Sequence, residues 1–174
     1  MSEVLIFNIT DDESLYRRVL DGFYEVQDDG TVKFKSQAFT DVEFKTSVDQ
    51  AKLCDNDPKR TLGNFSGGVV SLVAYDVRAI DDVKQYDRHQ TLLQQFHVDV
   101  EHVPIINDPI EPDNLAHAEI HTIPECPNSR VFKRLRDRLA LLANARQWEL
   151  KPSKLLYKEE VMECNGSPHN KSNE

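Results

Sequence analysis

The chain has 174 residues, of which 30 are acidic and 21 basic, and its formal net charge is −9 at pH 7. This length fits one domain, and the apolar share of 39% is enough for a single core. The sequence has no run of 18 apolar residues, which excludes a membrane-spanning helix, and its first residues do not resemble a secretion signal. We therefore expect a soluble protein of the cytoplasm with no membrane partner.

Short apolar runs separated by turn signals predict a mixture of strands and helices. In the first half of the chain, we expect a strand at 4–9, a helix capped by Thr10 and Glu13, a hairpin at 23–34 and an ambiguous segment at 36–52. A buried strand at 69–74 and a helix at 75–96 with a break at 81–82 follow. In the second half, we expect a half-exposed strand at 98–103, a loop at 104–114, a strand at 116–120 and a helix at 130–148.

The order of these elements has no regular β-α-β rhythm, which favours an α+β fold over a doubly wound parallel sheet. We predict a single small domain over residues 1–160, with a mixed or antiparallel sheet and a long amphipathic C-terminal helix. Residues 161–174 are rich in Asn, Ser, Gly and Lys, which predicts a flexible, disordered tail.

The three cysteines, Cys54, Cys126 and Cys164, are far apart and form no Cys-x-x-Cys pair. This excludes zinc-ribbon and thioredoxin-like sites and favours reduced thiols in a cytosolic protein. The sequence therefore predicts no cofactor.

His117, Glu119 and His121 are the most suggestive polar cluster. Residues two apart on a strand point to the same face, so these three side chains would line up. Two imidazoles and a carboxylate are a ligand set for zinc or iron. The alternative is that they form the polar face of a half-exposed strand whose other face is buried.

Two further enzymatic patterns involve the same region. Cys126 with His117 or His121 would make a thiolate–imidazole pair. Arg17, Ser47 and Glu119 loosely resemble, in their order along the chain, the residues with which ADP-ribosyltransferase-type domains hold NAD. The zinc-deaminase signature is excluded, because no second cysteine follows Cys126 at the required spacing.

The predicted C-terminal helix carries the strongest local charge. Residues 130–146 hold six basic side chains and one acidic, a charge of +5, which leaves −14 on the rest of the chain. Arg130, Arg134 and Arg138 lie near one another on the face opposite the apolar stripe. Arginine suits bidentate contact with carboxylate or phosphate, so this face predicts a docking surface for a partner or an anion. The alternative is a solvated face that balances the protein's own acids, including those at 81–82 and 108–113.

Several motifs occur in a familiar order before the Arg-rich helix. They are Asp29-Gly30-x-Val32 with Ala38-Phe39 and Ser47-Val48, then Gly68-Val69-Val70-x-Leu72-x-Ala74-x-x-Val77-Arg78, then Asp108-Pro109 and Pro112-Asp113-Asn114-x-Ala116-His117-Ala118. This order resembles a set of uncharacterised short bacterial hypothetical proteins over about residues 15–148. The resemblance implies a bacterial cytoplasmic protein that works beside other gene products, and it brings no activity with it. It singles out Arg78, Asn114 and His117, for which a turn cap at Asn114 and a bond from His117 to the loop carbonyls are structural explanations.

Two hypotheses follow. The first is a non-catalytic accessory or interaction protein, an adaptor or regulatory subunit that docks a protein partner on its Arg-rich helix. Nucleic acid is the second candidate partner, disfavoured by the net acidity. The other hypothesis is a small enzyme, ADP-ribosyltransferase-like or metal-dependent, that acts on a nucleotide or phosphate-bearing substrate through His117 and Glu119.

Overall fold

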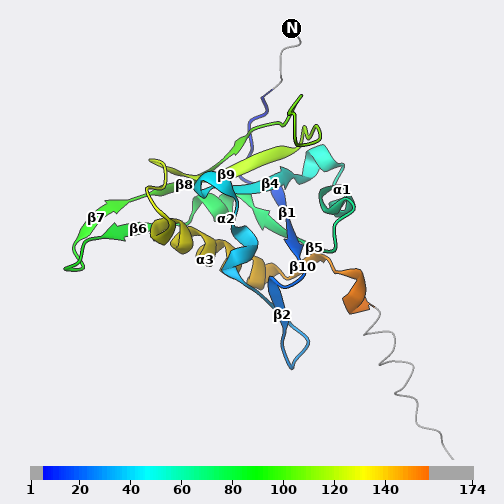
Figure 1. Cartoon of the computed structure of the whole chain (residues 1–174), viewed down its shortest axis with the longest axis horizontal. Coiled ribbons are helices and arrows are strands. Elements are labelled where there is room, and N and C mark those ends of the chain that lie inside the picture. The colour runs from blue at the N-terminus through cyan, green and yellow to red at the C-terminus, as the bar shows by residue number, and fades with distance from the viewer. Residues whose placement is uncertain (1–5, 157–174) are drawn as a thin grey trace, which may run out of the picture.

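The computed structural model describes residues 6–156 and shows an α+β fold, as predicted (Figure 1). A six-stranded antiparallel sheet has the strand order β10-β5-β1-β4-β9-β8, and two hairpins, β2–β3 and β6–β7, stand apart from it. Residues 161–174, the predicted tail, lie outside the described residues. The elements are β1 (Ser14–Leu20), β2 (Tyr24–Val26), β3 (Val32–Phe34), η1 (Ser36–Phe39), η2 (Val42–Phe44), β4 (Thr46–Gln50), η3 (Ala51–Cys54), α1 (Pro58–Leu62), β5 (Gly67–Val73), α2 (Ala74–Arg78), β6 (Lys84–Tyr86), β7 (Leu92–Gln95), β8 (His97–His102), β9 (His117–Ile123), α3 (Ser129–Arg146) and β10 (Trp148–Leu150).

The long helix α3 packs across one face of the sheet and closes the main core. The Asn128 side chain caps its first turn by accepting the N–H groups of Arg130 and Val131, both at 3.1 Å. Its apolar stripe, including the fully buried Leu135 and Leu139, contacts the inward residues of the central strands. The predicted helix is confirmed, although it ends at Arg146 and Trp148 begins β10 instead.

The predicted helix after Thr10 is wrong, because this segment is strand β1. Leu15 and Val19 are both fully buried, and a spacing of four puts them on one face of a strand as well as of a helix. The Thr10–Glu13 pair makes only a turn, closed by a 3.1 Å bond from the Glu13 N–H to the Thr10 carbonyl. Two neighbouring strands, β4 and β5, bond the β1 backbone, and this tertiary pairing overrides the local signal.

The strand predicted at 4–9 is also wrong over the residues that the structure describes, since residues 6–10 form no strand. Hydrogen bonds with side chains, and not with a neighbouring strand, hold this segment in place. The Phe7 N–H donates to His102 Nδ1 at 2.9 Å, and Arg78 Nη2 donates to the Ile9 carbonyl at 3.0 Å. Ile9 is buried, so the segment packs on the core without joining the sheet.

The helix predicted at 75–96 is only partly present, because α2 ends at Arg78 and the rest forms the β6–β7 hairpin. Asp87 fixes the hairpin turn by accepting the N–H groups of His89 and Thr91, both at 2.8 Å. Val83 and Phe96, buried at the base of the hairpin, are joined by a 2.9 Å backbone bond. The predicted elements at 23–34, 69–74, 98–103, 104–114 and 116–120 are confirmed, within a few residues at each end.

Candidate functional site

The predicted cluster on β9 lies on one face of the strand, but the three side chains do different things. His117 is buried, and its Nδ1–H donates to the Val103 carbonyl at 2.7 Å. Asn114 caps the turn before it, since its Oδ1 accepts the Ala116 N–H at 3.0 Å while its Nδ2 donates to Asp49 at 2.8 Å. The structure therefore shows the two structural explanations, a turn cap at Asn114 and a bond from His117 to a loop carbonyl.

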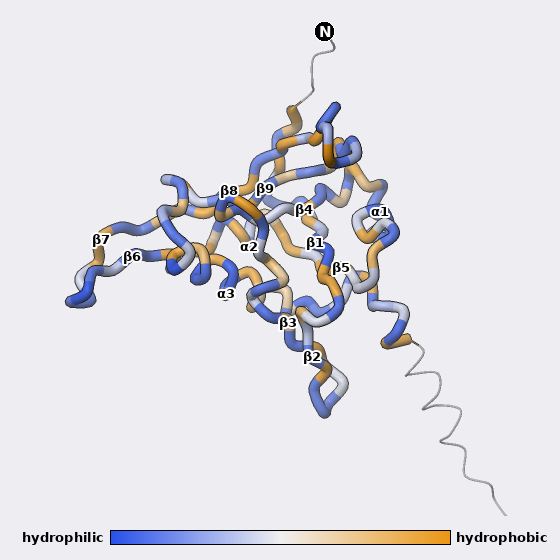
Figure 2. The backbone as a smooth tube through the Cα atoms, in the orientation of Figure 1, coloured by the Kyte–Doolittle hydropathy of each residue, from blue (hydrophilic) through white to orange (hydrophobic). Residues whose placement is uncertain are grey.

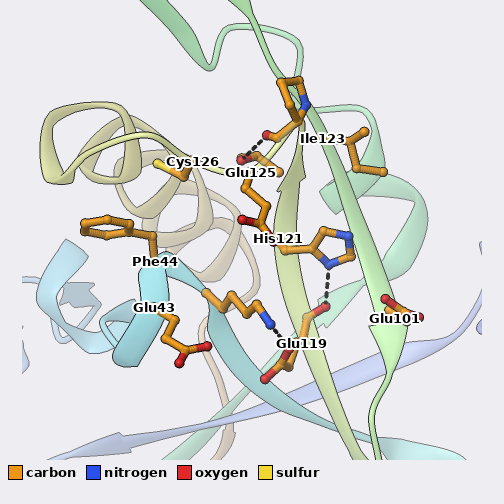
Figure 3. Close-up of a pocket in the computed structure, with 11 residues that line it drawn as sticks. Glu43, Phe44, Glu101, Glu119, His121, Ile123, Glu125 and Cys126 are labelled. Atoms are coloured by element: carbon orange, nitrogen blue, oxygen red, sulfur yellow. Dashed lines mark hydrogen bonds and ion pairs between the residues drawn. The ribbon is translucent and has the colours of Figure 1, made fainter.

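Glu119 and His121 line a pocket of about 590 Å³, which we call the β9 pocket (Figure 3). Lys45 Nζ lies 2.8 Å from the Glu119 carboxylate, and this bond raises the pKa of Lys45 above its ordinary value. His121 Nδ1 lies 3.4 Å from the Glu119 carbonyl oxygen, at the limit of a hydrogen bond. Within residues 6–156, no group of three His, Cys, Asp or Glu side chains is arranged to hold a metal ion.

Cys126 also lines the β9 pocket, but it is not a thiolate–imidazole partner. Its Sγ–H donates to the Asn128 carbonyl at 3.3 Å. Burial raises the pKa of this thiol above its ordinary value, against which the backbone hydrogen bonds act. A protonated thiol bonded to a backbone carbonyl is a weak nucleophile.

Arg17 is committed to the fold. Its Nη1 and Nη2 bind both oxygens of Asp41, at 2.6 and 3.1 Å. Its remaining bonds go to the carbonyls of Ala38 and Ser47, at 2.9 and 2.8 Å. Ser47 and Glu119 are direct neighbours on β4 and β9, and the Arg17 guanidinium reaches the Ser47 carbonyl while its ion pair goes to Asp41.

Arg78, singled out by the sequence motifs, likewise has a structural role. Its guanidinium contacts Asp99 and Asp11, each at 2.7 Å, and joins α2 to β8 and to the N-terminal segment. Burial raises the pKa of Asp99, but hydrogen bonds from Arg78 and from the Val100 N–H outweigh it and hold that pKa below its ordinary value.

Apart from Arg146, which donates to the Ser71 hydroxyl at 3.3 Å, the basic side chains of α3 divide into two groups. Arg138 pairs with Asp82, an acid from the loop before β6, and this hydrogen bond raises the pKa of Arg138. Lys133 pairs with Asp137 one turn later, and Arg136 donates to the Thr40 hydroxyl. Part of the charge on α3 therefore balances the protein's own acids, as one of the alternatives predicted.

Arg130 and Arg134 belong to the second group. Together with Lys84 and Tyr86 of β6 they line a groove of about 350 Å³ between the start of α3 and the hairpin, which we call the α3 groove. The Arg134 guanidinium lies over the Tyr86 ring, 5.2 Å from its centre. Within the described part of the chain, neither arginine nor Lys84 forms an ion pair with a carboxylate, although Asp87 lies on the groove wall.

Lys84 and Tyr86 were not predicted as site residues, because the sequence pattern of 75–96 favours a helix there. The sequence does contain a signal for the hairpin. Asp87 begins a five-residue polar turn, and an Asp in this position is typical of a hairpin turn. Comparisons with known proteins add no identification, since no family model, no curated protein and no solved structure matches the chain. No helix within residues 6–156 is long and apolar enough to cross a membrane.

Proposed function

We propose that this chain is a small accessory protein of the bacterial cytoplasm that binds an acidic segment of a protein partner in the α3 groove. The observation that supports this function is the group of basic side chains there, Lys84, Arg130 and Arg134, none of which forms an ion pair with a carboxylate of residues 6–156. On a chain with a net charge of −9, such a concentration of positive charge attracts acidic ligands locally.

The composition of the groove favours a carboxylate-rich peptide. The guanidinium groups of Arg130 and Arg134 suit bidentate bonds to carboxylates, and the Tyr86 ring adds an apolar contact for the chain of the ligand. The negative charge on the rest of the surface opposes the approach of a long polyanion such as DNA. The β9 pocket supports the enzyme alternative less well. That alternative needs His117, which does not line the pocket and is buried and bonded to the Val103 carbonyl.

Binding of a fluorescein-labelled poly-glutamate peptide, followed by anisotropy, tests the proposal, with duplex DNA of equal charge as competitor. We expect saturable peptide binding that Arg130→Glu with Arg134→Glu weakens by about tenfold or more. The matched control is Lys33→Glu with Lys59→Glu, which makes the same change of net charge at exposed positions outside the groove. The control should bind like the wild type.

Three results would overturn the proposal. The first is that the wild-type chain fails to bind the peptide. The second is that the control loses as much affinity as the groove variant, which would mean that only net charge matters. The third is that duplex DNA displaces the peptide at lower concentration than unlabelled peptide does, which would make nucleic acid the partner.

A further inference from the structure

The β6–β7 hairpin projects from the body of the protein (Figure 1). Every residue of β7 is exposed, and the exposed fractions of Leu92 and Leu93 are 49% and 59%. Figure 2 shows that the tip of this hairpin is hydrophilic. Within residues 6–156, β7 pairs only with β6, so its outer backbone edge has no neighbouring strand. Since a two-stranded hairpin is marginally stable in water, a further strand on this edge would stabilise it.

The free edge of β8 shows how this protein protects an edge strand. The Asp99 carboxylate accepts the Val100 N–H at 2.7 Å, and the Arg78 guanidinium reaches the Val100 carbonyl at 3.4 Å. A charged pair thus occupies the backbone groups that another strand would need. Charges placed in this way are a common device against edge-to-edge pairing.

The β7 edge carries no charged pair of this kind, although the β6–β7 register shifts at Leu93, which has no partner residue on β6. Residues 90–96 contain no charged residue, no proline and no glycine. An uncharged, extended segment with exposed leucines is the type of strand that pairs with another strand. Two copies of β7 can lie antiparallel across a two-fold axis without any charge facing another charge.

We infer that two copies of this chain associate through the outer edges of their β7 strands to form a four-stranded sheet, β6-β7-β7-β6. The partner strand is a second copy of β7, because two uncharged edges can pair without charge repulsion. The acidic segment proposed to bind the α3 groove would find no basic side chain on β7. This dimer does not depend on the proposed function. It would carry two α3 grooves, so that a partner with two acidic segments binds both.

Sedimentation velocity of the full chain over a range of concentrations tests this inference. We expect the wild type to shift from the 20.0 kDa chain mass to twice that mass as concentration rises. Leu93→Lys and Gln94→Lys each place a charge on β7, one at the register shift and one at a paired position, and each should weaken the dimer by about tenfold or more. The matched control, Leu141→Lys, makes the same change at a 54% exposed position on α3 and should leave the dimer intact.

Far-UV circular dichroism of each variant checks that the fold is kept, and using two β7 variants guards against the misfolding of one. The inference fails if the wild type stays at 20.0 kDa at every concentration. It also fails if both folded β7 variants dimerise like the wild type, or if Leu141→Lys dissociates the dimer equally, since the contact would then lie elsewhere.

Discussion

Replacing Arg17 by methionine should lower the free energy of unfolding by about 3 kcal/mol. The side chain is 12% exposed, and it makes a two-pronged ion pair with Asp41 and two further bonds to backbone carbonyls. Removing one member of a buried pair costs about 3–5 kcal/mol, because the other charge is left without its partner. The 26% exposure of Asp41 puts the expectation at the lower end of that range, since water solvates part of the carboxylate.

Urea unfolding at neutral pH, followed by the fluorescence of the single tryptophan, Trp148, measures this loss. Arg17→Lys keeps the charge without the planar fork, so its loss should be smaller, about 1–2 kcal/mol. In a double-mutant cycle, Asp41→Asn should destabilise the methionine variant less than it does the wild type. If Arg17→Met unfolds within about 1 kcal/mol of the wild type, the structural role of this residue is wrong and a role in binding must be reconsidered.

Three further predictions follow from single contacts. Because the folded-state pKa of Asp99 is lowered, its charge stabilises the fold above the unfolded-state pKa of about 3.9 and that stabilisation is lost as the pH falls below it. Asp99→Asn should therefore lower the urea concentration at the unfolding midpoint at pH 7, and this midpoint should then decrease less steeply as the pH is lowered. An unchanged dependence of the midpoint on pH would show that the bonds from Arg78 do not stabilise the fold. Gly68→Ala should lower the melting temperature and alter tryptophan fluorescence, because its Cβ would lie 2.6 Å from the Trp148 ring, and an unchanged emission spectrum would contradict that contact. Gln147→Ala removes two side-chain bonds to the backbone of β3 and should destabilise the fold by about 1–2 kcal/mol in urea unfolding; a loss below about 0.5 kcal/mol would refute it.

The sequence predicted the elements whose local signals agree with their tertiary contacts. In α3, the apolar stripe through Leu135 and Leu139 predicted the helix, whereas the Asn128 cap and the end at Arg146 are seen only in the structure. The strand β9 was predictable because buried and polar residues alternate along it. In both cases the pattern that forms the element also forms the core contact.

The errors came from segments whose spacing fits two structures. Leu15 and Val19 are four residues apart, so the burial of one face does not distinguish a helix from β1, and the neighbouring strands decide. In the β6–β7 hairpin, apolar residues are few, because most of the hairpin faces water. Without a buried face, hydrophobic periodicity carries little information about the element.

The same principle explains which site residues could be predicted. Asn114 and His117 lie beside a loop whose polar backbone groups need partners, so their roles follow from nearby sequence. The pairing of Arg138 with Asp82 was foreseen only as one of several options, because the acid is 56 residues away. The joining of Lys84 with Arg134 in one groove depends on where the hairpin lies, which the sequence did not show.

Both proposals therefore rest on the β6–β7 hairpin, but on different parts of it. The α3 groove uses the basic and aromatic side chains of β6 that face α3, whereas the dimer contact uses the outer edge of β7. Because none of the β7 residues 92–95 lines the groove, variants of the two surfaces should have separate effects. Leu93→Lys should yield a monomer that still binds the acidic peptide, and Arg134→Glu should yield a dimer that binds it weakly. If either variant lost both properties while remaining folded, the groove and the β7 edge would be parts of one binding surface.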